Sequence, residues 1–134
     1  MQDPHTGIFI SERTPRPKRS LDERTEQIAF TQWLKAHNIV YHSVPNNMSA
    51  DAKTTSHFKQ EGLVAGAPDL IVLSPRGVIA FEMKRESCAL RDVSEAQWKM
   101  LEAYAKTPGA WAVVAFGFRV AVPAYDRSMG AGCT

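Results

Sequence analysis

The sequence has few cysteines, no long apolar run and no strong excess of charge of either sign. Its two cysteines, Cys88 and Cys133, lack a paired metal-binding spacing, so neither a disulfide framework nor a zinc site is favoured. No charged-then-apolar leader is present, and no apolar run approaches the roughly 20 residues that span a bilayer, so we expect an intracellular protein without membrane contact. The net charge of +2 is too small to indicate a nucleic-acid partner by itself.

The length and composition indicate one globular domain. The chain has 134 residues, of which 44% are hydrophobic, and this is enough for one core. We expect a flexible basic arm over residues 1–19, a folded domain over residues 20–125 and a flexible tail over residues 126–134. Arg19 in the arm is a candidate for phosphate contact, although a solvated terminus explains the arm equally well.

Two apolar, strand-forming runs flank a short turn in the middle of the chain. They cover residues 70–73 and 78–81, and the turn between them is Ser74-Pro75-Arg76-Gly77. Proline and glycine occupy positions that a tight turn favours, so we expect a β-hairpin. A two-residue loop with proline fits strand twist poorly, and a bulge that shifts the register stays open as an alternative.

The hairpin brings charged residues together. If Ser74 pairs with Gly77, the same register places Asp69 opposite Glu82, and directly opposed side chains share a face of the sheet. Lys84 follows Glu82 by two positions and shares that face, because side chains alternate along a strand. The pattern therefore predicts two carboxylates and an ammonium group on one face of adjoining strands.

This group of charges favours a metal site. Two carboxylates about 5 Å apart repel by roughly 3 kcal/mol at an effective dielectric constant near 20. A divalent cation removes that repulsion, and carboxylate oxygens with water suit Mg²⁺ or Mn²⁺. Lys84 would orient the attacking water or neutralise charge on a phosphate. The alternative is an exposed hairpin on which Glu82 and Lys84 form a solvated ion pair.

Two capping boxes mark the helices. The first, Ser20 to Glu23, opens a helix expected to run to about Asn38, and its inward-facing stripe includes Glu26. Glu26 is a candidate third acidic group, or else a boundary residue that reaches solvent. The second box, Ser94 to Gln97, opens a helix to about Lys106. Gln97 has a structural explanation there, and alternatively it projects toward the carboxylates.

The remaining segments are strands and a loop. We expect strands at residues 39–44 and 111–116, the latter possibly extended through residues 118–122. Residues 46–66 show no clear periodicity and are expected to form a long loop. Within it, Lys53 and Lys59 are candidates for phosphate contact, as is Arg85 after the hairpin.

These motifs, in this order, resemble those of the VRR-NUC family of virus-type replication and repair nucleases, within the PD-(D/E)xK superfamily. The resemblance covers about residues 20–122 and is carried by Glu26, Gly66 to Asp69, Glu82 to Lys84, and Ser94 to Gln97. It implies an α/β restriction-endonuclease-like fold, with a mixed central sheet flanked by helices in the order αβββαβ. The combination of motifs is more specific than the short acidic motif alone.

The resemblance also implies roles for these residues. Asp69, Glu82 and the backbone carbonyl of Met83 would hold Mg²⁺ or Mn²⁺, and Glu26 would bind a second ion or its water. Lys84 would assist the nucleophile. The amide of Gln97 would support the site.

The implied activity is hydrolysis of DNA phosphodiesters by metal-activated water, without a small-molecule cofactor. The chain is similar to the stand-alone phage and bacterial type, which implies a homodimer that resolves Holliday junctions, because paired cuts need two sites related by two-fold symmetry. Three alternatives stay open. These are a nuclease of flaps or other branched DNA, a restriction-type endonuclease, and a non-catalytic DNA-binding module of the same fold. A purely structural role would leave the carboxylate repulsion unexplained.

Overall fold

The computed structural model of the protein describes residues 7–11, 22–44, 57, 59–62 and 64–130. A five-stranded mixed sheet forms the centre, in the order β1-β5-β4-β3-β2. Pairing is antiparallel between β2, β3 and β4, and parallel between β4, β5 and β1. The strands are β1 (Phe9–Ile10), β2 (Val40–Ser43), β3 (Leu70–Ser74), β4 (Gly77–Lys84) and β5 (Ala110–Phe116).

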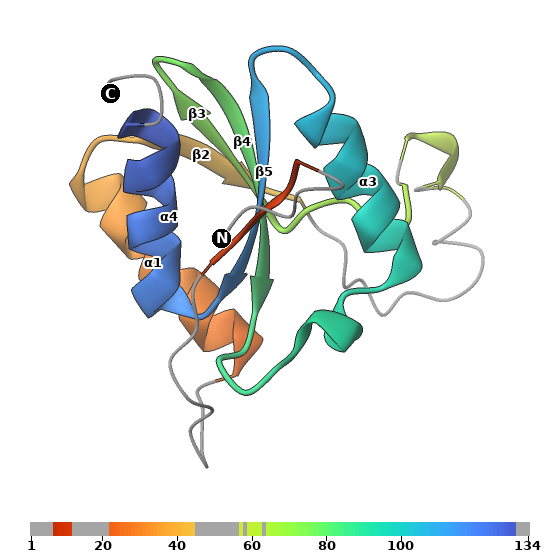
Figure 1. Ribbon diagram of the computed structural model, residues 1–134, viewed down its shortest axis with the longest axis horizontal. Coiled ribbons are helices and arrows are strands. Elements are labelled where there is room, and N and C mark those ends of the chain that lie inside the picture. The colour runs from red at the N-terminus through yellow and green to blue at the C-terminus, as the bar shows by residue number, and fades with distance from the viewer. Residues whose placement is uncertain (1–6, 12–21, 45–56, 58, 63, 131–134) are drawn as a thin grey trace.

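Helices cover both faces of the sheet (Figure 1). Helices α1 (Glu23–Ala36) and α4 (Phe118–Gly130) lie on one face, and α3 (Glu95–Ala105) lies on the other, preceded by the short 3₁₀ helix η1 (Leu90–Asp92). The expected mixed sheet with flanking helices is therefore confirmed. The elements αβββαβ occur in the expected order, and β1 and α4 add one element at each end.

Two hydrophobic layers separate the helices from the sheet. The first packs α1 and α4 against the sheet, with Phe30, Phe81 and Met83 completely buried. The second packs α3 against β5, with Leu101 and Val114 completely buried. Because successive side chains of a strand point to opposite faces, the burial of Phe81 and Met83 in the first layer turns their neighbours on β4 toward the α3 side.

The hairpin has the register expected from the sequence. Ser74 pairs with Gly77, Leu73 with Val78, and Leu70 with Phe81, without a bulge. The Ser74 hydroxyl donates to the Gly77 carbonyl at 2.9 Å and accepts from the Gly77 N–H at 3.2 Å. These side-chain bonds stabilise a turn whose proline would otherwise fit strand twist poorly.

The first helix begins later than its expected capping box. Asp22 is the N-cap, and its Oδ1 accepts from the Thr25 N–H at 2.7 Å. The prediction of a Ser20 cap is therefore wrong: Asp22, two positions on, accepts from one free N–H group of the first turn, and Ser20 lies outside the described residues. The helix ends at Ala36, and Asn38 adopts a φ of 57° that turns the chain into β2.

The two ends of the domain also differ from expectation. Within the expected basic arm, β1 pairs in parallel with β5, and Ile8 is completely buried, so the described residues 7–11 are part of the fold. The expected extension of the last strand through residues 118–122 is wrong, because Gly117 (φ 97°) ends β5 and α4 begins at Phe118. Helix α4 runs to Gly130, well into the expected flexible tail, and packs against α1.

The expected long loop is not wholly irregular. Part of the loop expected over residues 46–66 is helical, at His57, Lys59 and Gln60. The expectation of a loop without helix is wrong there. Lys53 lies outside the described residues, as does Arg19. Within the described part of the chain, no helix is both long enough and apolar enough to cross a membrane.

Candidate active site

Asp69 and Glu82 face each other at the open end of the hairpin. The Asp69 N–H donates to the Phe81 carbonyl at 3.0 Å, which continues the β3–β4 ladder by one residue and sets Asp69 opposite Glu82. Asp69 is 8% exposed and Glu82 is 1% exposed. The pair is therefore buried, and the alternative of an exposed hairpin with solvated charges does not describe it.

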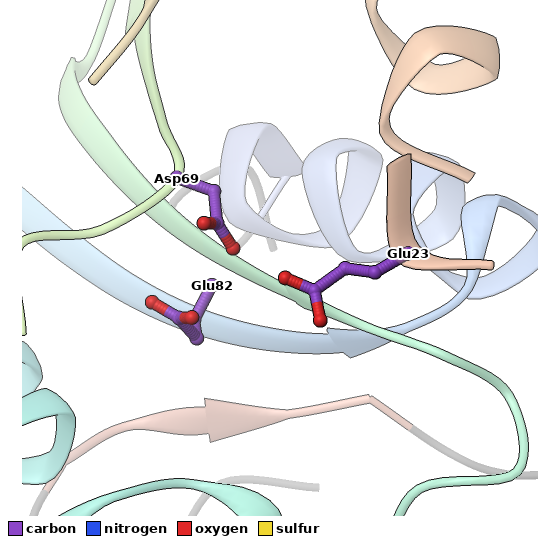
Figure 2. A group of neighbouring side chains, drawn as sticks. All are labelled: Glu23, Asp69 and Glu82. Atoms are coloured by element: carbon purple, nitrogen blue, oxygen red, sulfur yellow. The ribbon is translucent and has the colours of Figure 1, made fainter. Parts of the chain in front are cut away.

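A third carboxylate reaches this pair from α1. Glu23, Asp69 and Glu82 each offer an oxygen that lies within 4.8 Å of the other two. Figure 2 shows the Glu23 side chain extending from the first turn of α1 toward the two carboxylates of the hairpin. The Asp22 cap fixes the start of that turn, so the position of Glu23 follows from where the helix begins.

The carboxylate oxygens of the hairpin are not equivalent. Asp69 Oδ2 accepts from the Met83 N–H at 2.7 Å, and Glu82 Oε1 accepts from Gln97 Nε2 at 2.8 Å. Glu82 Oε2 is buried without a hydrogen-bond partner, alone among the side-chain oxygens and nitrogens of the described residues. An orphaned buried carboxylate oxygen is costly unless a cation or a proton binds it.

Lys84 and Gln97 complete the group around the hairpin carboxylates. Lys84 Nζ donates to Gln97 Oε1 at 3.2 Å and lies 3.9 Å from Glu82 Oε1. Gln97 Oε1 also accepts from the Ser94 N–H at 2.8 Å, while the Ser94 hydroxyl accepts from the Gln97 N–H at 3.1 Å. The expected capping box is thus present, and the same glutamine also contacts the carboxylates, so both readings of Gln97 hold.

Burial raises the pKa values of all three carboxyl groups, and repulsion from Asp69 raises those of Glu82 and Glu23 further. Burial and the neighbouring Asp69 raise the pKa of Glu82 to about 9, although Lys84 opposes this. Burial raises the pKa of Asp69, and the hydrogen bond from the Met83 N–H lowers it in part. Burial and the charge of Asp69 raise the pKa of Glu23. One ammonium group does not neutralise three carboxylates, so the site favours protons or a cation.

The residues present fit a divalent cation. The donor set consists of carboxylate oxygens, which Mg²⁺ and Mn²⁺ prefer. Glu82 Oε2 is buried and unpartnered, and Glu23, Asp69 and Glu82 each offer one oxygen within 4.8 Å of the other two. Glu23, Asp69 and Glu82 would hold such an ion.

Glu26 lies one turn further along α1 and away from this group. It is 3% exposed, as the inward-facing stripe predicted, but its Oε2 accepts from the Phe118 N–H at 3.3 Å at the start of α4. Glu23, one helical turn before it, is the residue brought to Asp69 and Glu82. Sequence reasoning assigned Glu23 to a capping box alone. The available signal was its spacing of three positions from Glu26, which places both on one side of a helix.

The other predicted contacts are spread around the site. Arg85 is exposed and lies near the acidic group: the Thr25 hydrogen bonds and then the charge of Arg85 lower the pKa of Asp22, and the same charge partly opposes the raised pKa of Glu23. Lys59 is exposed. The Met83 side chain is buried in the core, and the Met83 backbone N–H donates to Asp69 Oδ2. A role for the Met83 carbonyl stays a prediction.

The loop before Asp69 packs directly on α3. Gly66 has a φ of 82°, and a Cβ atom there would overlap the carbonyl group of Ala96 and lie 2.7 Å from the Gln97 nitrogen. Because glycine has no Cβ atom, the backbone at Gly66 can approach the backbone of α3 this closely. Gly66 therefore brings the loop that carries Asp69 against the helical turn that carries Gln97.

A solved structure has the same fold. The structure of a "VRR_NUC domain protein" matches with a TM-score of 0.67 and 26% sequence identity, and the match covers 85% of this chain and 93% of that chain. No protein-family model matches the sequence, and no curated protein matches it. The PD-(D/E)xK-like fold of the chain and its resemblance to the VRR-NUC family, both expected from the sequence motifs, are thereby confirmed.

Proposed function

We propose that the protein is a nuclease that requires Mg²⁺ or Mn²⁺ and hydrolyses DNA phosphodiesters. The observation that carries this proposal is the buried, unpartnered Glu82 Oε2, which lies in a group of three carboxylates beside a lysine. A structural role does not explain a group of buried like charges, whereas a cation between them does. The fold shared with a VRR_NUC domain protein supports the same activity.

In this proposal each side chain has a separate task. A bound divalent cation would supply a Lewis acid for a phosphate oxygen and lower the pKa of water. Glu23, Asp69 and Glu82 hold that ion. Lys84 stabilises the negative charge that develops on the scissile phosphate, because its ammonium is buried beside the carboxylates and is held by a neutral amide.

Gln97 keeps this lysine available. Its Oε1 accepts from Lys84 and its Nε2 donates to Glu82 Oε1, so the amide lies between the two side chains and hydrogen-bonds to both. The Lys84–Glu82 separation of 3.9 Å is longer than a direct hydrogen bond. Lys84 therefore keeps donor capacity for a substrate oxygen. Gln97 is a positioning residue in this scheme.

Branched DNA is the proposed substrate, and a homodimer is the proposed assembly. Both come from the resemblance to stand-alone VRR-NUC proteins, and two sites related by two-fold symmetry suit paired cuts at a four-way junction. Arg85 supports phosphate contact, because it is exposed and lies beside Glu23. Lys59, Lys53 and Arg19 are further candidates for DNA contact. Recognition through phosphates would read DNA shape and not base sequence.

The test is cleavage of labelled four-way junction, flap and linear duplex DNA with Mg²⁺, Mn²⁺ or a chelator. The Lys84→Ala variant should abolish cutting, and Lys99→Ala serves as the matched control because Lys99 is exposed on α3 and pairs with Glu95. Metal-dependent cutting of the junction, absent in Lys84→Ala and retained in Lys99→Ala, supports the proposal. Preferential cutting of flap DNA would mean that flaps, and not four-way junctions, are the substrate. Tight DNA binding without cleavage in either metal would indicate a non-catalytic DNA-binding module.

A further inference from the structure

Glu26 holds the amino-terminal end of α4. Its side chain is 3% exposed, and its Oε2 accepts from the Phe118 N–H at 3.3 Å. Phe118 is the first residue of α4, and the first N–H groups of a helix have no partner within the helix. A carboxylate at that position also interacts favourably with the helix dipole. Glu26 therefore links α1 to the start of α4.

This link lies at the catalytic end of the sheet. Phe118 comes two residues after Phe116, and Phe116 pairs with Lys84 on the neighbouring strand. Glu26 therefore hydrogen-bonds to the backbone two residues after the β5 position that pairs with Lys84. Within α1, Glu26 follows Glu23 by three positions, which is less than one helical turn. The same short stretch of α1 is anchored at Glu26 and delivers Glu23 to the acidic group.

The Glu26 and Glu86 side chains pack closely against Gly117, whose positive φ favours glycine. Gly117 has a φ of 97°, and a Cβ atom there would overlap Glu26 Oε2 and lie 2.5 Å from Glu86 Cγ. The charge of Glu86 and the burial of Glu26 both raise the pKa of Glu26, with burial the larger cause, while the Phe118 N–H and Arg119 lower it. The hydrogen bond from the Phe118 N–H therefore helps to keep the Glu26 carboxyl group in this buried position.

We propose that Glu26 is a positioning residue, which anchors α1 to the start of α4 and so places the Glu23 carboxylate against Asp69 and Glu82. This inference rests on the proposed metal-dependent function. It assigns Glu26 a task outside the metal-binding group, where the resemblance had implied a ligand of a second ion or its water.

The test compares Glu26→Ala, Glu26→Gln and Glu23→Gln, with Glu95→Gln as a control on an exposed residue of α3. Mn²⁺ affinity is measured by the loss of the free-ion electron paramagnetic resonance signal, and thermal unfolding is followed in parallel. A glutamine at position 26 keeps an oxygen that accepts from Phe118, so its affinity should stay within about 3-fold of the natural protein. Glu26→Ala and Glu23→Gln should each weaken Mn²⁺ binding by about 10-fold or more.

The pattern separates the possible roles of Glu26. If Glu26→Gln weakens Mn²⁺ binding as much as Glu23→Gln does, Glu26 is a ligand and the inference is overturned. If Glu26→Ala lowers the unfolding temperature but leaves Mn²⁺ affinity unchanged, Glu26 is only structural, which also overturns it. Should Glu26→Ala not fold, Gly117→Ala places a methyl group against Glu26 Oε2 and should weaken Mn²⁺ binding likewise.

Failure of the underlying function would look different. If the natural protein binds no Mn²⁺, or if Glu82→Gln binds it as tightly as the natural protein does, the metal-dependent function fails, and the inference about Glu26 fails with it. If Mn²⁺ binding requires Glu82 but does not respond to Glu26→Ala in a folded protein, the function stands and only the inference about Glu26 is lost.

Discussion

Lys84 Nζ lies 3.2 Å from Gln97 Oε1 and 3.9 Å from Glu82 Oε1, so the ammonium is closer to a neutral amide than to the buried carboxylate of its own strand. Gln97 also donates to Glu82 Oε1 at 2.8 Å. The amide of one side chain thus fixes both charged groups. Because that side chain belongs to the first turn of α3, the start of the helix is tied directly to β4, the strand that carries Glu82 and Lys84.

Gln97→Ala should lower the rate of cleavage much more than it lowers stability. The change removes the partners of Lys84 and Glu82, and loss of such supporting contacts costs about 10- to 100-fold in activity or metal affinity. Ser94→Ala is the matched control, because it removes only the Ser94 hydroxyl that accepts from the Gln97 N–H. It should cost about 1 kcal/mol of stability and leave the rate nearly unchanged. Equal loss of rate in both variants, measured in single-turnover cleavage, would contradict the role of Gln97.

The hairpin and its two carboxylates were predictable from the sequence because their geometry is local. A two-residue turn between Ser74 and Gly77 fixes the register, and the register alone places Asp69 opposite Glu82. The capping box of Ser94 and Gln97 was predictable for the same reason, since its bonds join residues three positions apart. These features needed no knowledge of how the elements pack together.

The third carboxylate was not predictable in the same way. Glu23 and Glu26 lie on the same side of α1, and only the packing of the helix on the sheet decides which of them meets Asp69. That packing depends on α4, whose first residue binds Glu26. The apolar residues between Phe118 and Val122 fit a continued strand as well as the start of a helix, and only the turn at Gly117 distinguishes the two.

Gly66→Ala should destabilise the protein more than Gly62→Ala. Both glycines have positive φ values, 82° and 113°, so both substitutions introduce backbone strain. Only at Gly66 would the new Cβ atom meet other backbone, that of Ala96 and Gln97, whereas nothing lies within 4 Å at Gly62. We expect Gly62→Ala to cost about 1 kcal/mol and Gly66→Ala at least about 2 kcal/mol more, measured by urea unfolding. Equal costs would mean that the loop does not press on α3.

Arg85→Ala should weaken DNA binding without changing metal binding. Arg85 is exposed and lies beside Glu23, where a phosphate close to the metal site would pass. Loss of one phosphate contact should reduce the slope of log affinity against log salt by about 1. Arg76→Ala is the control, because Arg76 packs over Trp111 at the turn of the hairpin, roughly 20 Å along β4 from Glu82. An unchanged salt slope in Arg85→Ala, measured by fluorescence anisotropy with Ca²⁺ in place of Mg²⁺, would remove Arg85 from the interface.

Without metal, the folded protein should lose stability as the pH rises toward 9. The pKa of Glu82 is raised from an ordinary value of 4.5 to about 9 in the folded protein. Between these values the folded state binds a proton that the unfolded state has released. The stability that this proton provides is therefore complete below about pH 4.5 and is lost as the pH rises through the folded pKa. Added Mg²⁺ competes with the same proton, so it should raise the unfolding temperature more at about pH 8.5 than at about pH 6.

Glu82→Gln separates this titration from other effects of pH. The amide keeps the size of the side chain and is neutral without a proton, so the cost of keeping the Glu82 carboxyl group protonated above its ordinary pKa of 4.5 disappears. Without metal at about pH 8.5, the variant should unfold at a higher temperature than the natural protein, and the difference should shrink as the pH falls. Mg²⁺ should no longer stabilise it. Two parallel profiles of unfolding temperature against pH, with equal responses to Mg²⁺, would show that Glu82 neither titrates in this range nor holds the ion.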